Sequence, residues 1–496
     1  MSETFEEDES EDILSAVLRV TETVKNADSY DELASALALR YAAREDFDRA
    51  VEVADTINDP YTQEKTIADI AVKSAAAGHE EGALELVDSL EDFSHQTTAL
   101  SQLAVAHAAA GDFARAVELA SGMEDNSSTL AEIAAQCATA GDFERALEIT
   151  ETLDLPLYRA LALSRIADSY IKAGRTDEAT ELLAQARDET LEIDTDDERA
   201  STRAEIALRL AEAGQAEQSA EVFAQAIEDA ELAEDAYREI TLAQIAVSHA
   251  RLKQYDRAVA VTEKINDVYV AADTLATLAT IERAEEGREA DALQLLGDAY
   301  ELLSEDEPED QKEELQRWRA LATVAVRYAE FGEHAQALKA AESVGSVNDK
   351  SRALVGIALR SAEAGDADAA LQTARAIDDN NYRVNAFLQL SRALISTDAT
   401  SEAGFTTLLE AIRHIEQLER PVERVFGLAA AANIYAEAGR KEQTTRLLLQ
   451  ALTECKLING EFEKASALLS IADAYAKAGD EPDEKAKEML WEISAV

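Results

Sequence analysis

Histidine, cysteine and acidic side chains are the groups in this sequence that could act as metal ligands, nucleophiles or general acids and bases. No two histidines lie within three to five positions of each other, as a local metal motif would require: they are His79, His95, His107, His249, His334 and His414. Cys137 and Cys455 are equally isolated, so neither a zinc site nor a disulfide framework is expected. We therefore predict no metal ion.

Acidic residues and glycines are abundant, but their spacing does not indicate a reaction. With 101 Asp and Glu among 496 residues, any helix offers carboxylate pairs, so such pairs say little about acid–base catalysis. The glycines are separated by whole repeats rather than grouped as GxGxxG or GxxxxGK, so no phosphate-binding loop is indicated. We predict no catalytic residue, no cofactor and no enzymatic activity.

The composition is apolar and strongly acidic. Hydrophobic residues make up 47% of the chain, aromatic residues only 5%, and 46 basic against 101 acidic residues give a net charge of −55. This acidic, Lys-poor, Ala-rich composition resembles that of cytosolic proteins from extreme halophiles, where salt screens the repulsion. The sequence shows neither a signal peptide nor a run of 18 apolar residues, so we expect a cytoplasmic protein without a membrane partner.

A short motif returns thirteen times along the chain. "CATAGDFERALEI" (residues 137–149) nearly repeats "HAAAGDFARAVEL" (residues 107–119). If the glycine of AGDF is taken as the turn residue, successive copies lie 30 to 45 residues apart, which is typical of stacked supersecondary units. The turn residues are Glu45, Gly78, Gly111, Gly141, Gly174, Gly214, Lys253, Gly287, Gly332, Gly365, Asp398, Gly439 and Gly479.

Helical spacing flanks each turn residue on both sides. Positions 11, 8, 7 and 4 before it form one mostly apolar helical face, and His107, Cys137 and His249 at position 4 are interpreted as packing residues. A small residue follows five positions after it, at Ala50, Ala83, Ala116, Ala146, Ala179, Ser219, Ala258, Ala292, Ala337, Ala370 and Ala403. Gly ends the first helix and Asp112, Asp142 or Asp366 caps the second, so we predict helical hairpins and an all-α fold.

The hairpin pattern resembles the tetratricopeptide repeat (TPR). The segment "LSRIADSYIKAGRTDEA" (residues 163–179) supplies the residues that carry the resemblance: Ile166, Ala167, Tyr170, Gly174 and Ala179. The chain departs from the family in lacking its first-helix Trp and most of its late Pro residues. The resemblance implies a right-handed α-solenoid of about thirteen TPR-like hairpins.

The repeats define the expected organisation of the chain. We predict an acidic disordered tail at residues 1–10, an N-terminal capping helix at 11–26, a solenoid at 27–480 and a C-terminal capping helix at 481–496. The acidic segment 304–314 is a candidate hinge between domains or a longer acidic loop, and we favour the loop.

The resemblance also implies where a partner would bind. In TPR-like solenoids the first helices line a concave groove for peptides, and residues six and two positions before each turn residue point into it. Most copies have Ala or a larger apolar residue at the first of these positions. Polar residues at the two positions are our candidate groove-binding residues: Asp168, Lys172, Arg392, Asn433, Asp473 and Lys477. Asn433 alone fits the family's carboxylate clamp, so no clamp is expected.

Together these observations favour a non-enzymatic scaffold that binds a segment of a partner protein in the concave groove. An acidic groove would prefer segments that carry Lys or Arg. The alternative is a regulatory or sensor module that binds a small ligand and changes the curvature of the solenoid. We expect nucleic acid to be excluded as a partner, because a chain with a net charge of −55 repels phosphate groups.

Overall fold

The chain is entirely helical wherever its structure is described. The computed structural model describes residues 12–495, and the tail predicted at residues 1–10 lies outside them. The described residues form 27 α-helices, one 3-10 helix (η1, Thr190–Glu192) and no strand, which confirms the all-α prediction. Within this part of the chain, no helix is both long enough and apolar enough to cross a bilayer.

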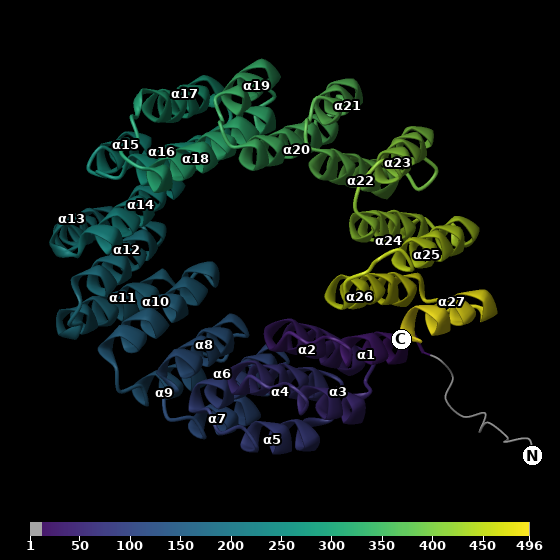
Figure 1. Ribbon diagram of the computed structural model, residues 1–496. Coiled ribbons are helices and arrows are strands. Elements are labelled where there is room, and N and C mark those ends of the chain that lie inside the picture. The colour runs from purple at the N-terminus through teal and green to yellow at the C-terminus, as the bar shows by residue number, and fades with distance from the viewer. Residues whose placement is uncertain (1–11, 496) are drawn as a thin grey trace, which may run out of the picture. The chain divides into compact units, whose positions relative to one another are not determined.

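The helices form two compact units of nearly equal length, and unit 1 is made of two separate stretches of the chain. Unit 1 comprises the residues up to Gln96 and those from Val347 onward, whereas unit 2 comprises Thr97–Ser346. Each unit consists of helical pairs, and Figure 1 shows the first helices on one side of each unit and the second helices on the other. We call the side of the first helices that faces away from the second helices the first-helix face.

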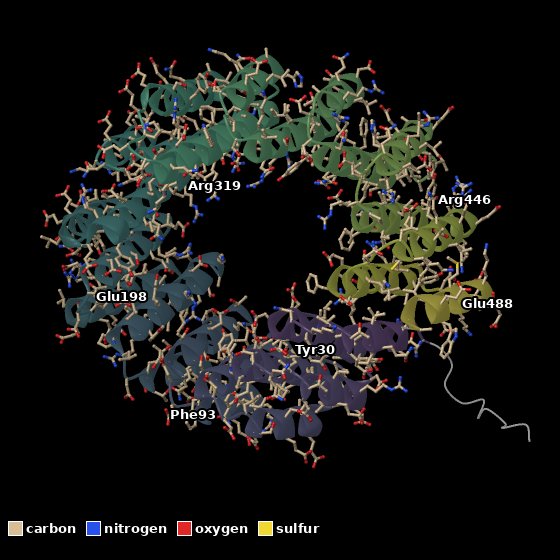
Figure 2. The ribbon with its side chains drawn as sticks, viewed as in Figure 1. Tyr30, Phe93, Glu198, Arg319, Arg446 and Glu488 are labelled. Atoms are coloured by element: carbon tan, nitrogen blue, oxygen red, sulfur yellow. The ribbon has the colours of Figure 1, made fainter. Side chains whose placement is uncertain are left out.

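Unit 2 contains seven helical pairs. Its first helices are α6 (Phe93–Ala109), α8 (Ser127–Thr139), α10 (Pro156–Lys172), α12 (Asp196–Glu212), α14 (Asp235–Arg251), α16 (Val268–Arg283) and α18 (Gln311–Glu330). Its second helices are α7 (Phe113–Ser121), α9 (Phe143–Glu151), α11 (Thr176–Glu189), α13 (Ala216–Leu232), α15 (Tyr255–Thr262), α17 (Glu289–Glu305) and α19 (His334–Glu342). Figure 2 shows Arg319 on the side of α18 away from α19, on the first-helix face.

Unit 1 contains both ends of the described chain. Its first helices are α2 (Ala27–Ala43), α4 (Pro60–Ala76), α20 (Val347–Glu363), α22 (Asn380–Thr397), α24 (Pro421–Glu437) and α26 (Glu461–Ala478). Its second helices in chain order are α3 (Phe47–Ala54), α5 (Glu80–Asp88), α21 (Ala367–Arg375), α23 (Glu402–Ile415), α25 (Lys441–Cys455) and α27 (Glu484–Ser494). One further helix, α1 (Ile13–Thr21), precedes them.

Backbone geometry confirms twelve of the thirteen predicted turn residues. Ten are glycines with φ between +63° and +93°, the left-handed conformation that ends a helix most cheaply at glycine. Glu45 and Lys253, which take the place of glycine in their copies, adopt the same conformation with φ of +63° and +59°. The repeat pattern therefore identified this conformation even where the residue type did not.

The turn predicted at Asp398 is present, but Asp398 does not adopt the left-handed conformation, and the repeat pattern is shifted there by one residue. Asp398 has φ of −143°, and Ala403, the predicted small contact residue, is exposed. Gly404 takes the buried position instead, and a Cβ atom on it would lie only 2.7 Å from Ile395 Cγ1. A side chain at position 404 would thus push α23 away from α22.

Caps begin the helices where the sequence predicted them. The carboxylates of Asp112, Asp142 and Asp366 each accept a hydrogen bond from the backbone N–H three residues later. Pro60 and Pro156 stand at the first positions of α4 and α10. These local signals fix where each helix starts and therefore which residues reach the first-helix face.

A recurring arginine, which the sequence analysis missed, fastens each of five first helices to the loop before it. It stands fifteen positions before the turn residue, and its guanidinium donates to backbone carbonyls of that loop or, for Arg317, to those of Leu303 and Ser304 at the end of α17. In α10, for example, Arg159 Nη1 donates to the carbonyls of Leu153 and Asp154, at 2.6 and 3.0 Å. The five arginines are Arg159, Arg199, Arg317, Arg383 and Arg424.

Candidate functional site

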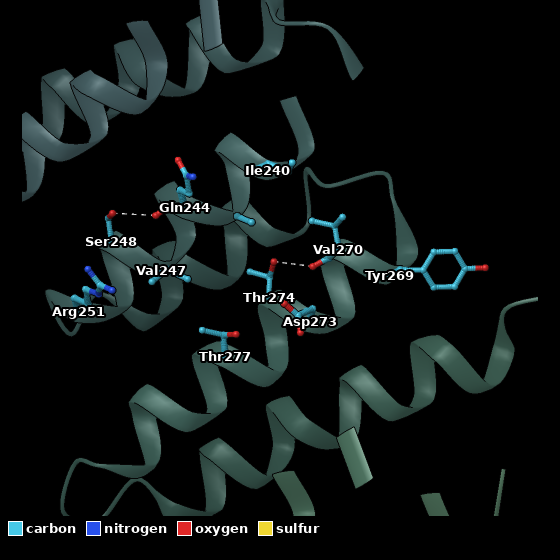
Figure 3. Close-up of a pocket in the computed structure, with 11 residues that line it drawn as sticks. Ile240, Gln244, Val247, Ser248, Arg251, Tyr269, Val270, Asp273, Thr274 and Thr277 are labelled. Atoms are coloured by element: carbon cyan, nitrogen blue, oxygen red, sulfur yellow. Dashed lines mark hydrogen bonds between the residues drawn. The ribbon is translucent and has the colours of Figure 1, made fainter. Parts of the chain in front are cut away.

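The first-helix face of unit 2 contains a groove between α14 and α16 (Figure 3). It has a volume of about 570 Å³. We call it the α14–α16 groove and define it by its lining residues: Ile240, Ala243, Gln244, Val247, Ser248 and Arg251 from α14, and Tyr269, Val270, Asp273, Thr274 and Thr277 from α16.

Most of the groove surface is apolar. Two of its hydroxyl groups add little polarity, because they donate hydrogen bonds to carbonyls of their own helices. Ser248 Oγ donates to the carbonyl of Gln244 at 2.9 Å, and Thr274 Oγ1 donates to the carbonyl of Val270 at 2.7 Å (Figure 3). Ile240, at the edge of the groove, is 53% exposed. An exposed branched side chain beside an apolar groove is a typical contact point for a partner.

Charged groups lie only at the rim of the groove. Arg251 ends α14 and Asp273 is exposed on α16, so the two rim charges are opposite in sign. Figure 3 shows Tyr269 pointing away from the other lining residues. Its hydroxyl donates to Asp306 Oδ2 at 3.0 Å, and burial together with this hydrogen bond raises the pKa of Tyr269. Tyr269 thereby ties α16 to the loop between α17 and α18, inside the candidate hinge segment 304–314.

The structure places the six predicted groove-binding residues outside the α14–α16 groove, and five of them form ion pairs. On the first-helix face of unit 2, Asp168 of α10 pairs with Lys172 at 2.7 Å and with Arg209 of α12 at 3.1 Å. In unit 1, Arg392 of α22 pairs with Glu437 of α24 at 3.1 Å, and Lys477 of α26 pairs with the same Glu437. Except for Lys172, which pairs within α10, these residues link neighbouring first helices.

Asp473 and Asn433 complete the set of predicted residues. Asp473 of α26 pairs with Arg40 of α2 at 2.7 Å. Asn433 of α24 has a buried side-chain oxygen without a hydrogen-bond partner among the described residues. A role for Asn433 in ligand binding stays a prediction.

A partly buried carboxylate lies beside the ion pairs of α10 and α12. Burial raises the pKa of Glu205, while Arg165 and Arg209 oppose that shift. Ser164 Oγ of α10 is 3.5 Å from Glu205 Oε1, and Arg165 pairs with Glu132 of α8 at 2.9 Å. Charges across α8, α10 and α12 therefore bind one another rather than standing open to a partner.

His249 and both cysteines lie in buried packing positions. His249 is 3% exposed, and its ring packs against that of Phe223 in a tilted arrangement, with centroids 4.2 Å apart. Burial raises the pKa of the Cys137 thiol to about 11 and that of Cys455 to about 12, so both stay protonated and poorly nucleophilic at neutral pH. Across residues 12–495, no three His, Cys, Asp or Glu side chains are arranged to bind a metal ion.

The acidic charge is distributed unequally between the two kinds of helix. The thirteen first helices contain 24 Lys and Arg and 26 Asp and Glu, whereas the thirteen second helices contain 12 and 35. The expected acidic groove is thus not found on the first helices, which are nearly neutral. The net charge of −55 comes mainly from the second helices, the loops and the N-terminal tail.

Sequence reasoning missed the α14–α16 groove because it searched for polar exceptions. Val247 stands six positions before its turn residue, where an apolar residue is the rule, so it attracted no attention. The sequence did contain one signal for the groove, Ile240. This large apolar residue stands on the outward side of a first helix, at the repeat position that Arg319 occupies in α18.

Comparisons with known proteins identify the kind of fold and no family. No protein-family model matches the chain, and no curated protein matches it. Solved structures with similar helical pairs include Ton1535 from Thermococcus onnurineus, at 18% identity and a TM-score of 0.25 over 71% of this chain and 97% of that one. They also include the pentatricopeptide repeat protein PPR10 from maize, at 15% identity and a TM-score of 0.30 over 97% and 80%. At such identities and TM-scores these likenesses carry no argument about function.

One comparison corrects the predicted exclusion of nucleic acid. Human IFIT1, at 13% identity and a TM-score of 0.26 over 89% of this chain and 99% of that one, was solved with PPP-AAAA. A helical-repeat chain can therefore carry a nucleotide ligand, and the exclusion was wrong. Its physical error was to apply the net charge of the whole chain to one face, although the first helices are nearly neutral.

Proposed function

We propose that this chain is a non-enzymatic scaffold that binds a segment of a partner protein on its first-helix face, with the α14–α16 groove as the central contact. The observation that carries the proposal is the combination of an apolar groove with the exposed side chain of Ile240 at its edge. Burying such a side chain against a partner contributes about 1.5–3 kcal/mol.

The chemistry of the groove indicates what kind of segment would fit. Val247 and Val270 offer apolar contact, while Arg251 and Asp273 at the rim can each pair with one opposite charge. A segment with apolar side chains and few, mixed charges suits this lining better than a polybasic one. The near neutrality of the first helices supports the same choice.

Cellular setting is part of the proposal. We propose that the chain works in the cytoplasm at high salt, because a net charge of −55 calls for strong screening. At about 1 M salt the screening length is roughly 3 Å, so binding must rely on apolar contacts rather than on long-range attraction. We therefore expect affinity for the partner segment to persist in about 2 M KCl.

Peptide selection on the purified chain tests the proposal. A phage-displayed random peptide library is selected against the wild-type chain in high KCl, and the affinities of enriched peptides are measured by fluorescence anisotropy. Ile240→Asp should weaken binding at least about tenfold, because it puts a carboxylate where apolar contact is needed. The matched control is Leu191→Asp, which changes another exposed branched side chain, 68% exposed and outside the groove.

Three outcomes would contradict the proposal. The first is equal weakening by both substitutions, which would place the contact elsewhere. The second is tight binding of a single-stranded oligoadenylate RNA, used as a second probe, without any peptide binding. The third is the absence of peptide binding together with compaction of the chain by a small metabolite in X-ray scattering, which would favour the sensor alternative.

A further inference from the structure

Helix α1 has the sequence pattern of a second helix, although no first helix precedes it among the described residues. Asp12 stands directly before α1 as Asp142 stands before α9, and Ala16 follows four positions later as Ala146 does. Both alanines are completely buried, and both helices are nine residues long. A residue pattern that serves helix pairing is thus present at the N-terminal end of the repeats.

Helix α26 is the last of the first helices, and α1 packs on it in the place of a second helix. Helix α1 packs against α26, α27 and α2 within unit 1, as Figure 1 shows. Helix α27 begins five positions after Gly479, whereas α9 begins two positions after Gly141, and α27 packs on α25 and α1. The chain after α26 therefore bypasses the usual place of the second helix, and α1 occupies it.

Specific contacts hold α1 in this place. We define the α1 seat as the surfaces of α26, α27 and α2 that α1 contacts. The apolar side of α1 consists of Ile13, Leu14, Ala16, Val17 and Val20, all at most 1% exposed. Arg19 donates to Ser494 Oγ from Nε at 3.2 Å and from Nη2 at 3.0 Å. Its guanidinium also lies 5.6 Å from the centre of the Trp491 ring.

The link between α1 and its own chain is short and exposed. Residues 22–26 join α1 to α2, and Glu22, Lys25 and Asn26 among them are exposed. Most of the α1 seat is instead built from the far end of the sequence, since 475 positions separate Arg19 from Ser494. Every group that α1 contributes is therefore also present on the α1 helix of a second copy.

We propose that α1 is a transferable second helix and that the α1 seat accepts the α1 helix of a second copy of this chain, which gives a dimer by helix exchange. Such exchange keeps all native contacts and changes only which chain supplies them. The length of segment 22–26 decides whether α1 occupies the seat of its own chain or that of a second copy. A shorter segment cannot bring α1 back to the seat of its own chain.

A peptide experiment tests whether the seat binds α1 without a covalent link. A protease site replaces residues 23–25 in the full-length chain, which is folded and then cut. A fluorescein-labelled peptide of residues 11–24 is added, and its anisotropy is followed. The peptide should exchange into the seat, and the same peptide carrying Val17→Asp should bind at least about tenfold more weakly. Because the substitution is in the peptide, the folding of the chain is unaffected.

A second experiment tests the dimer. Deletion of residues 23–25 should double the mass measured by light scattering after size exclusion, with unchanged helicity in circular dichroism. The matched control lengthens the same link with Gly and Ser residues and should remain monomeric. A monomeric deletion variant would overturn the exchange, and a cut chain that fails to bind the wild-type peptide would overturn the transferable seat.

Discussion

Arg40 of α2 and Asp473 of α26 form a two-point ion pair, with Nε to Oδ1 and Nη2 to Oδ2 both at 2.7 Å, although 433 positions separate them in the sequence. Within unit 1, the pair joins α2, the earliest of the first helices in the sequence, to α26, the last of them. It therefore offers a direct probe of how the two ends of the chain interact.

The coupling between Arg40 and Asp473 should be small and sensitive to salt. Their side chains are 30% and 51% exposed, so water screens the attraction. A double-mutant cycle with Arg40→Ala and Asp473→Ala, measured by urea denaturation, should give a coupling of about 0.2–1 kcal/mol at low salt. In about 1 M KCl it should nearly vanish. A coupling of zero at low salt would show that the two helix ends do not meet in solution.

Arg159 should matter more than an exposed arginine because it satisfies carbonyl groups of the preceding loop. Arg159→Met leaves the carbonyls of Leu153 and Asp154 without their donor and removes the 2.9 Å pair with Glu189. We expect a loss of about 1–3 kcal/mol in the free energy of unfolding. The matched control is Arg446→Met on α25 (Figure 2), an exposed site that should change stability by less than about 0.5 kcal/mol. Equal effects would contradict the fastening role.

Alanine substitutions at Gly141 and Gly82 distinguish the effect of backbone conformation on stability from the effect of available space. A Cβ atom on either glycine would meet no other atom within 4 Å, but only Gly141 has a positive φ, at +89°. Gly141→Ala should therefore destabilise the chain by about 1 kcal/mol through backbone strain. Gly82→Ala, inside α5, should stabilise it by up to about 1 kcal/mol through helix propensity. Thermal denaturation of the two variants checks the signs, and the same sign for both would refute this distinction.

His249 should make stability depend on pH below neutrality. Burial lowers the pKa of its imidazole, an effect that the hydrogen bond to Gln254 opposes. The folded-state pKa is thus below the unfolded value, so the unfolded chain takes up the proton first as the pH falls. Stability should be constant above about pH 7 and decrease below about 6.5.

Replacing His249 with the residue found at this position in other repeats isolates its contribution. His249→Tyr matches Tyr41 and Tyr170 and removes the titrating ring. Urea midpoints measured between pH 7.5 and 5.5 should fall less for this variant than for the wild type. An equal fall would assign the pH dependence to other groups, such as His414, whose pKa burial also lowers.

Local features were predictable from the sequence because each repeat reports on them independently. Glu45 and Lys253 illustrate this point, since neighbouring copies marked them as turn residues despite their type. Asp398 illustrates the limit, because a longer turn shifted the pattern by one residue and moved the buried contact from Ala403 to Gly404. Aligning the repeats by residue spacing alone cannot detect such a shift, because the shift is visible only in how the surrounding side chains pack.

Contacts between distant repeats were not predictable in the same way. The sequence marked Asp473 as a polar exception, but it did not indicate that Arg40 would meet it. Small rotations between successive pairs accumulate along an array, and the spacing of residues does not encode them. The capping role expected for residues 11–26 stays a prediction, and the sequence did not indicate that α1 would pack against α26 and α27 as well as α2.

The pairing of α1 with α26 also sets an order in time during synthesis. Helix α1 leaves the ribosome first, but α26 begins only at Glu461. At about 5–20 residues per second, α1 waits on the order of 20–90 s for its seat. Throughout that interval Ile13, Leu14 and Val17 lack their final contacts, so a nascent chain carries an exposed apolar helix that chaperones can recognise until the last repeat is made.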